Sequence, residues 1–357
     1  MANFLRLNLF AAMAAGLVLL GAGCVSFGPS EAGSGSAGGI FRSVDRGDVW
    51  ANKSALLTAT GERRTFGASS VGVIVQDPQD PKAIYVGTAE HGMFYSYDSG
   101  ESWSQPAGIR QGRVWSVAIH PRDKCTIFVT VDNKVAKSDD CSRTWSVPFL
   151  DSRTEARTKV VAIDGYNPNV IWVAMSTGDL LRSQDSGVSW SNVHSFKNDI
   201  MRLVISPSDS RRIFVATRNA GIWRTDDAGA NWLDLSKNYE DFSKSKEFLD
   251  LAIGVSDPGV VIFASKYGLI RSRDFGDSWE KIDLLTPPGQ SIAYSLAIDP
   301  KNSDNIYFGT ATTFNKSTNG GANWITKRLP TTRAATVLRV DQANSDVIWM
   351  GVTKFDN

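Results

Sequence analysis

The segment SYDSGESW at residues 96–103 decides the fold, because the chain carries seven versions of it. The versions begin at residues 43, 96, 138, 183, 225, 272 and 317, and they share the pattern Ser/Thr-x-Asp-x-Gly-x-Ser/Thr-Trp. The third position holds Asp45, Asp98, Asp140, Asp185, Asp227, Asp274 and Asn319, and the last holds Trp50, Trp103, Trp145, Trp190, Trp232, Trp279 and Trp324. Two versions depart from the pattern: Ser142 replaces the glycine, and Val49 replaces the second hydroxyl residue.

The sequence around each repeat predicts short β-strands. A run rich in β-branched and aromatic residues precedes each repeat, as at residues 83–88 and 212–217. An earlier apolar run ends in turn residues, as at 117–121 and 296–300. Each unit is therefore expected to form four antiparallel strands, with the repeat as the hairpin between the third and fourth. There the carboxylate accepts backbone N–H groups, glycine supplies a positive φ, and the tryptophan is buried between sheets.

The spacing of the repeats predicts a closed ring. Successive third positions lie 53, 42, 45, 42, 47 and 45 residues apart, which is the length of one propeller blade. The last two expected strands, at 337–340 and 347–351, have no repeat after them, whereas residues 39–43 form a strand before the first repeat. Joining these ends completes a seventh blade and removes two free sheet edges. We therefore expect an all-β, seven-bladed β-propeller of four-stranded antiparallel blades at residues 39–357, with the N- and C-terminal strands sharing one blade.

The repeat resembles the Asp-box, or BNR, repeat, and its seven copies extend over residues 39–357. Asp-box propellers include sialidases, xyloglucan hydrolases, the sortilin ectodomain and the lipidated assembly factors of photosystem II. The resemblance implies that the box lies away from the ligand-binding face. The third-position residues and the tryptophans are accordingly expected to be structural.

The first residues resemble a bacterial lipoprotein signal. A lone charge, Arg6, precedes an apolar run that is too short to span a bilayer as a mature helix. The run ends in LGAGC at 20–24, which resembles a lipobox although the leucine lies four places before the cysteine. We therefore expect a signal peptide at 1–23, lipidation of Cys24, a flexible Gly/Ser linker at 24–38, and an extracytoplasmic, membrane-anchored lipoprotein. The alternative is an ordinary secretory signal with an incidental cysteine.

Composition excludes several classes of function. The 38 Lys and Arg residues balance 37 Asp and Glu residues, so the net charge of +1 excludes a chain-wide polybasic nucleic-acid binder. Three scattered histidines and three cysteines predict no metal site, and we expect no cofactor. If Cys24 is lipidated, Cys125 and Cys141 remain as a pair at one end of their blade. A disulfide between them is expected outside the cytoplasm, the alternative being two buried thiols.

The loops that enter the first strand of each blade are basic. The spans 51–70, 104–113, 146–159, 191–202, 233–250, 280–291 and 325–335 hold 17 Lys and Arg residues against 11 Asp and Glu residues. Clustered arginines bind carboxylates and attract acidic partners, whereas scattered loop cations are merely solvated. The candidate ligand face comprises Arg63, Arg64, Arg110, Arg113, Arg153, Arg157, Arg202, Lys327, Arg328 and Arg333, together with Lys159.

Two functions fit these features. The favoured hypothesis is a membrane-tethered, non-catalytic propeller that binds a protein or peptide partner, acidic in character, through its loop face. The alternative is a carbohydrate-active propeller, a glycoside hydrolase of the sialidase type, for which Tyr294 and the loop arginines supply part of the set. The candidate carboxylates Asp151, Glu155, Asp199 and Asp250 form no recognisable catalytic set. Trp115, Trp172, Trp223 and Trp349 are expected in the core, which leaves few aromatic platforms for a glycan.

Overall fold

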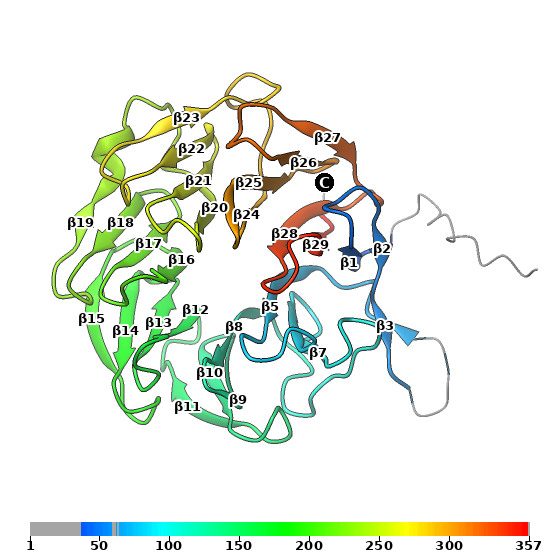
Figure 1. The fold of residues 1–357 in the computed structure, drawn as a ribbon. Helices are drawn as coiled ribbons and strands as arrows, with labels where there is room; N and C mark the ends of the chain where they lie inside the picture. The colour runs from blue at the N-terminus through cyan, green and yellow to red at the C-terminus, as the bar shows by residue number, and fades with distance from the viewer. Residues whose placement is uncertain (1–36, 59–61, 63, 356–357) are drawn as a thin grey trace, which may run out of the picture. The chain divides into compact units, whose positions relative to one another are not determined.

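The computed structural model describes residues 37–58, 62 and 64–355, and these residues form a ring of seven antiparallel sheets (Figure 1). The first strands of the blades surround the centre and are β5 (Val71–Gln76), β8 (Val114–His120), β12 (Thr158–Ile163), β16 (Ile200–Ile205), β20 (Phe248–Ile253), β24 (Ser295–Asp299) and β28 (Ala334–Val340). The second strands are β6 (Ile84–Thr88), β9 (Asp123–Val131), β13 (Ile171–Met175), β17 (Ile213–Thr217), β21 (Val261–Ser265), β25 (Asn302–Gly309) and β29 (Ile348–Thr353).

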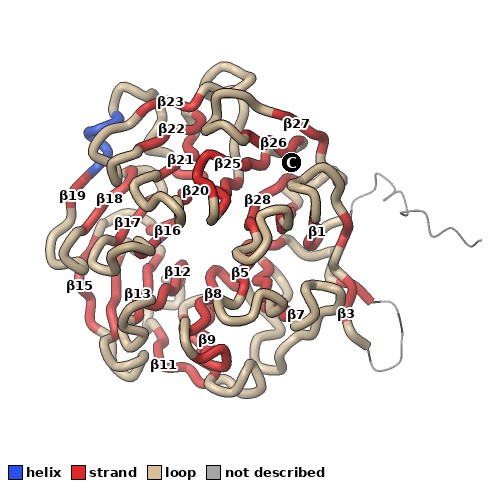
Figure 2. The backbone as a smooth tube through the Cα atoms, in the orientation of Figure 1, coloured by secondary structure: helices blue, strands red, loops and turns tan. Residues whose placement is uncertain are grey.

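The third and fourth strands lie toward the outside of the ring. The third strands are β7 (Met93–Ser96), β10 (Lys134–Ser138), β14 (Asp179–Ser183), β18 (Gly221–Thr225), β22 (Gly268–Ser272), β26 (Thr313–Ser317) and β1 (Gly39–Ser43). The fourth strands are β11 (Ser146–Leu150), β15 (Ser191–Ser195), β19 (Leu233–Asp234), β23 (Glu280–Ile282), β27 (Ile325–Arg328) and β2 (Ala51–Asn52). Outside the blades lie a small hairpin, β3 (Ala55–Leu56) and β4 (Arg64–Thr65), and one 3-10 helix, η1 (Leu235–Tyr239), shown in blue in Figure 2.

The predicted seven-bladed, all-β ring is confirmed, and six of its blades have four strands. The blade β5–β6–β7 has three, because its fourth strand is reduced to one antiparallel bridge between Tyr95 and Ser104. Two features end the pairing there. Pro106, two residues later, has no N–H to donate, and Trp103 exchanges backbone hydrogen bonds with Ala55 and Leu57 instead.

The ring closes as expected from the ends of the chain. Strand β1 pairs with β29 over five residues, from Gly39 opposite Val352 to Ser43 opposite Ile348. The resulting sheet has the order β2-β1-β29-β28, so strands from both ends of the described chain share one blade. Closure pairs β1 with β29, so neither of these two strands is left at a sheet edge.

Each repeat forms the hairpin between the third and fourth strands, as that of Asp185 illustrates. The Ser183 hydroxyl donates to Asp185 Oδ1 (2.8 Å) and accepts from the N–H of Gly187 (2.8 Å). The N–H and hydroxyl of Ser189 donate to the two carboxylate oxygens of Asp185. These hydrogen bonds, led by that of the Ser189 hydroxyl, lower the pKa of Asp185 to about 2. The repeat is thus a closed hydrogen-bonded unit within eight residues.

The seven repeat tryptophans each contact a different one of seven hydrophobic clusters. Only Trp103 is fully buried, and its Nε1 donates to the carbonyl of Lys53 (2.6 Å). The other six are partly buried, which departs from the expectation of a ring enclosed between sheets. They lie over the outer edges of the clusters, because the hairpins that carry them are at the periphery of the ring.

A cation directly before the repeat links neighbouring blades. Arg182 Nη1 donates to the carbonyl of Ala228 in the next repeat (3.0 Å), and Arg224 Nη1 donates likewise to Phe275 (2.9 Å). The same contact recurs from Arg42 to Ser99, from Arg271 to Gly320 and from Lys316 to Arg46. These inter-blade cations therefore contact the same position of the following repeat, including across the closure of the ring.

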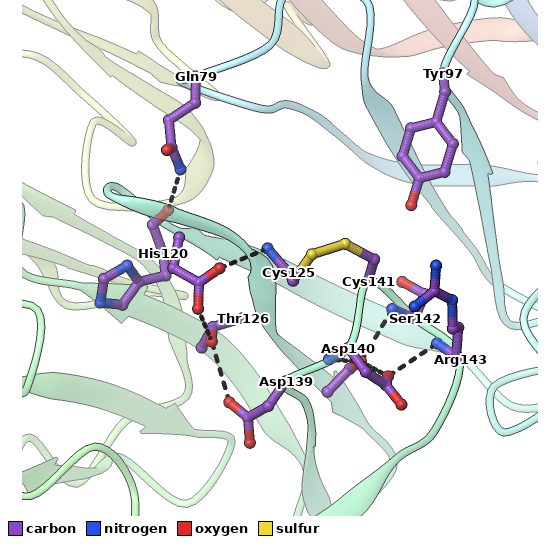
Figure 3. The surroundings of a disulfide bond; sticks show 12 residues. Gln79, Tyr97, His120, Cys125, Thr126, Asp139, Asp140, Cys141, Ser142 and Arg143 are labelled. Atoms are coloured by element: carbon purple, nitrogen blue, oxygen red, sulfur yellow. Dashed lines mark hydrogen bonds between the residues drawn. A yellow bond between two sulfur atoms is a disulfide. The ribbon is translucent and has the colours of Figure 1, made fainter.

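A disulfide joins Cys125 to Cys141 within one blade (Figure 3). Cys125 lies near the start of β9, and Cys141 lies in the turn of the repeat, where its N–H also donates to the carbonyl of Cys125 (3.1 Å). The bridge spans the repeat in which Ser142 replaces glycine, and Ser142 adopts a φ of 69°. The disulfide thus closes the one repeat that lacks the residue suited to this conformation.

Candidate functional site

Because the strands of each blade are antiparallel, their connections lie alternately at the two opposite ends of the ring. The repeats and the turns between first and second strands lie at one end, here called the turn face. The loops entering the first strands and the turns between second and third strands lie at the other, here called the loop face. No helix among the described residues is long and apolar enough to cross a membrane.

At the loop face, the centre of the ring opens into a cavity of about 560 Å³, here called the mouth cavity. Its walls come from the first residues of β5, β8, β12, β16 and β28 and from the residues that follow β29. Four cations line it: Arg113, Lys159, Arg202 and Lys354. No described lining residue is acidic. The mouth cavity is therefore positively charged, and its volume is typical of ligand sites.

Trp115 holds two of these cations close together. The Arg113 guanidinium carbon lies 4.5 Å from the Trp115 ring centroid, and the Lys159 ammonium lies 3.7 Å from it. Both distances allow cation–π attraction. Burial lowers the pKa of Lys159, an effect opposed by Asp199, whose Oδ2 is 3.7 Å from the ammonium. The aromatic ring thus offsets part of the cost of placing two positive charges at one wall.

The carboxylates beside the mouth cavity are already engaged by the protein. Asp199 Oδ2 accepts from Nε and Nη2 of Arg218. Asp250 Oδ1 accepts from the N–H of Leu251 (2.8 Å), and its Oδ2 accepts from the N–H of Leu296 (2.9 Å). Burial raises the pKa of Asp250. Asp199 Oδ1 is buried without a partner among the described residues. Neither group therefore presents a free pair of oxygens to the cavity.

An aromatic pair lies at the opposite side of the mouth cavity. Phe355 lines the cavity, and its ring centroid is 4.9 Å from that of Tyr294, which directly precedes β24. Tyr294 therefore contacts another aromatic ring at the loop face. Together with Trp115, the pair provides apolar surface beside the cations.

The structure divides the predicted loop-face cations into groups. Arg113 and Arg202 meet in the mouth cavity. Arg64 and Arg110 line a second cavity of about 580 Å³ beside the β3–β4 hairpin, where Arg64 also pairs with Glu62 (2.9 Å). Arg63 lies outside the described residues.

The remaining predicted cations are held locally. Arg153 pairs with Asp151 (2.7 Å) and Asp179 (3.0 Å). Arg157 donates to the carbonyls of Thr154 and Ala156, and Arg333 donates to those of Ala68 and Ser69. Lys327 pairs with Asp48. Arg328 is exposed at the end of β27. Lys327 lies on the outer strand β27 rather than in a loop, and its partner Asp48 belongs to a repeat. The predicted basic face is therefore not one continuous patch.

Sequence reasoning missed several residues of the centre. Trp115 was expected in the core but lines the mouth cavity, because it is the second residue of β8 and lies at the end of that strand nearest the loop face. Trp172 and Trp349, by contrast, are buried as expected. Lys354 and Arg339 were not singled out. The available signal was a cation inside an apolar inner-strand run, as in Leu338-Arg339-Val340.

The described residues contain no group of three or more His, Cys, Asp or Glu side chains that could hold a metal ion. The cations, aromatic rings and engaged carboxylates of the mouth cavity favour binding of an anionic group. They do not form a paired acid and base with free oxygens.

Fold and site together define the protein as a seven-bladed β-propeller with a basic central mouth. No protein-family model matches the chain. Over 342 residues it is 22% identical to a xyloglucanase from a Paenibacillus species, covering 80% of this chain and 30% of that enzyme. It is 30% identical over 169 residues to the photosystem II assembly protein Ycf48 of Thermosynechococcus vestitus, covering 44% of each protein. It is also 30% identical over 132 residues to the vacuolar protein sorting/targeting protein 10 of Pyricularia oryzae, covering 33% of this chain and 8% of that protein.

Solved structures show the same fold. A GH74 xyloglucanase from Xanthomonas campestris aligns with a TM-score of 0.64 at 15% identity, covering 79% of this chain and 51% of the enzyme. Ycf48 bound to a D1 peptide aligns with a TM-score of 0.62 at 14% identity, covering 80% of this chain and 94% of that protein. The chain thus spans about 30% of the length of the xyloglucanase it matches in sequence, and its relatives include both enzymes and a peptide-binding propeller.

Proposed function

We propose that this protein is a lipid-anchored, extracytoplasmic Asp-box propeller that binds an acidic segment of a protein or peptide partner and catalyses no reaction. The observation that carries the proposal is the mouth cavity, which is lined by four cations and by no described acidic residue. Lys159 and Arg202 have carboxylate oxygens only at 3.7 Å, in Asp199 and Asp250. Arginine and lysine at such a site favour carboxylates, and the adjacent aromatic rings favour the apolar parts of a peptide. A propeller of the same fold, Ycf48, has been solved with a peptide bound.

The membrane anchor rests on the sequence alone. Cys24 and the linker at 24–38 would place the propeller at a membrane surface outside the cytoplasm. Cys24 lies outside the described residues. Incorporation of a radiolabelled fatty acid by the wild type, and its loss in Cys24→Ala, would test this part of the proposal independently of ligand binding.

A glycoside hydrolase is the second candidate, because xyloglucanases are among the relatives. Such an enzyme requires two carboxyl groups available to the substrate, one as acid and one as base or nucleophile. The oxygens of Asp250 accept two backbone N–H groups, and Asp151 is bound by Arg153. This engagement favours the non-catalytic function, and a hydrolysis screen with xyloglucan and sialosides provides the direct comparison.

The test is photo-cross-linking in cells with the full-length protein. A photoreactive residue at Phe355 reports on the mouth cavity, and one at Val188, which is 82% exposed in a repeat at the turn face, serves as the matched control. We expect a reproducible protein partner from position 355 and none from 188. Arg113→Glu should reduce that cross-link without changing the melting temperature, whereas Arg328→Glu should leave both unchanged.

Two results would count against the proposal. Equal cross-linking from both positions would show that the mouth cavity is not the contact, and loss of folding in Arg113→Glu would make that residue structural. Arg110→Glu is a separate test, because Arg110 lies in the cavity beside the β3–β4 hairpin. A cross-link unaffected by Arg110→Glu would confine the partner to the mouth cavity.

A further inference from the structure

The centre of the ring holds another cavity besides the mouth cavity, of about 490 Å³, in the half nearer the turn face. It is here called the inner cavity. Its walls are the later residues of four consecutive inner strands, β16, β20, β24 and β28. Aliphatic side chains form most of the lining, among them Val204, Leu251, Ile253, Leu296, Ile298 and Leu338. A concave, mostly apolar space of this volume with a few polar groups is typical of a small-ligand site.

Two guanidinium groups interrupt this apolar lining. Arg339 lies on β28, and Arg202 lies on β16 at the boundary with the mouth cavity. No described residue lining the inner cavity is acidic. A third cation, Lys301, also lines the cavity, but its ammonium donates to the carbonyl of Ala343 (2.5 Å). The cavity therefore combines aliphatic walls with two guanidinium groups that share one space.

Arg339 has no acceptor within the described part of the chain. Its Nε is buried without a hydrogen-bond partner there, whereas the side chain as a whole is partly exposed, and no ion pair joins it to a described residue. Burial lowers the pKa of Arg339, and the charge of Arg202 lowers it further. A guanidinium stays protonated at neutral pH, so this partly exposed side chain carries a charge without an ion-pair partner among the described residues.

Arg202 is only weakly paired. Its nearest carboxylate oxygen is Asp250 Oδ1 at 3.7 Å, which is longer than a hydrogen bond. Both oxygens of Asp250 are engaged by backbone N–H groups, as described above. The side chain of Arg202 is 43% exposed, and that exposed surface faces the two central cavities that it lines.

The arginines among the inter-blade cations, which stabilise the fold, have donors paired with backbone acceptors. Arg182, Arg224 and Arg271 each donate to a backbone carbonyl of the next repeat. The Nε of Arg182 is also buried without a partner, but Arg182 donates through Nη1, whereas no side-chain atom of Arg339 donates to a described residue. An unpaired donor fork beside aliphatic walls indicates a site whose acceptor comes from a ligand.

We propose that the inner cavity binds a carboxylate carried on an apolar body, with the carboxylate between Arg202 and Arg339 and the body against the aliphatic side chains of β20 and β24. The two guanidinium groups match a carboxylate in charge and in donor geometry. The chemistry is shared by the C-terminal residue of a peptide with an aliphatic side chain and by a free aliphatic carboxylic acid. This site adjoins the mouth cavity and shares Arg202 with it, whereas Arg339 lines only the inner cavity.

Isothermal titration calorimetry on the full-length protein tests the inference with matched probes. Octanoate represents the free acid and octanamide its uncharged counterpart. A short peptide ending in leucine represents the chain terminus, and the same peptide with an amidated C-terminus is its control. We expect saturable binding of octanoate, of the free-acid peptide or of both, and none of either amide. The probe that binds identifies the source of the carboxylate.

Arg339→Met separates ligand binding from structure. It removes the charge and retains most of the side-chain volume, so affinity for the carboxylate probe should fall about tenfold to a hundredfold. The unliganded melting temperature should stay the same or rise, because the change removes a partly buried charge and an Nε that has no partner among the described residues. Arg328→Met, on an exposed cation at the end of β27, should change neither quantity.

Three results would overturn the inference. They are equal binding of acid and amide, unchanged affinity in Arg339→Met, and absence of saturable binding of both carboxylate probes. A lower melting temperature in Arg339→Met with no carboxylate binding would instead assign the arginine to the fold. The titrations use the isolated protein and the discriminating variant is at Arg339, which lines only the inner cavity, so their failure is distinguishable from failure of partner binding at the mouth cavity.

Discussion

Asn319→Asp should stabilise the protein, because it restores the carboxylate found in the other six repeats. The repeat beginning at 225 is the appropriate reference, since both it and the repeat beginning at 317 end in Gly-Ala-Asn-Trp. Asp227 accepts from the N–H of Asn231 (2.9 Å) and also from its Nδ2 (2.7 Å). From Asn323, Asn319 accepts the equivalent N–H (2.9 Å) but not the side-chain amide, because its second terminal atom is an amide nitrogen.

The magnitude follows from one added hydrogen bond with a charged acceptor. At this exposed site solvent screens the carboxylate, so the added hydrogen bond contributes at most about 1 kcal/mol. For a domain of this size, that corresponds to a rise in melting temperature of about 2 °C. The hydroxyl of Ser317, which donates to Asn319 Oδ1 at 3.0 Å, should also bind the carboxylate more strongly.

The gain should depend on pH with a defined sign. The reference carboxylate, Asp227, has its pKa lowered to about 2, mainly by hydrogen bonds from Asn231. A carboxyl group whose pKa falls on folding contributes stability above its unfolded pKa of about 3.9 and loses it as the pH falls toward the folded value. The added stability should therefore be complete at pH 7 and decline below pH 4.

The assay is thermal unfolding of wild type, Asn319→Asp and Asp227→Asn at pH 7, 4 and 2.5. Asp227→Asn is the reverse change in the matching repeat and should lower the melting temperature at pH 7 but much less at pH 2.5. An unchanged or lower melting temperature for Asn319→Asp at pH 7 would refute the reasoning. A gain of the same size at pH 2.5 would show that the carboxylate charge is not its cause.

Three further predictions concern the turn face and the blade contacts. Ser142→Gly should raise the free energy of unfolding by about 0.5–1 kcal/mol, because Ser142 has a φ of 69°, which favours glycine. Gly187→Ser, at the same position of another repeat, should lower the free energy of unfolding. Chemical denaturation measures both changes. Replacing Cys125 and Cys141 with serine should cost about 3 kcal/mol, since the bridge closes a separation of 16 residues, and a reductant should destabilise the wild type but not the variant. Arg182→Met should accelerate amide hydrogen exchange in the next repeat around Ala228 and not in its own, because it removes the donor to that carbonyl; unchanged exchange at Ala228 would assign Arg182 no inter-blade role.

The seven-bladed fold could be predicted because its decisive interactions are local. Ser183, Asp185, Gly187 and Ser189 satisfy one another within seven residues, so their spacing is visible in the sequence. The recurrence of that unit at blade length then predicts the ring, and the unmatched terminal strands predict its closure. The reduced fourth strand after Trp103 was not predicted, because it depends on backbone pairing with Ala55, 48 residues earlier.

The candidate site was predicted only in part. The basic loops drew attention to Arg113 and Arg202, which do meet in the mouth cavity, and also to Arg110 and Lys327, which lie elsewhere. Sequence alone gave no reason to separate them, because loop length does not tell how far a side chain lies from the axis. Trp115 was assigned to the core for the same reason: its strand is apolar, but its position at the start of that strand exposes it to the cavity.

The sequence by itself determined the repeat, its internal hydrogen bonds and the number of blades, because these depend on residues a few positions apart. The tertiary structure alone decided which cations cross between blades, and which side chains face the two central cavities. Arg202, Asp250 and Arg339 come from three strands widely spaced along the chain. They share a space only after the ring closes, and no periodicity in the sequence records which inner-strand residues will meet across its axis.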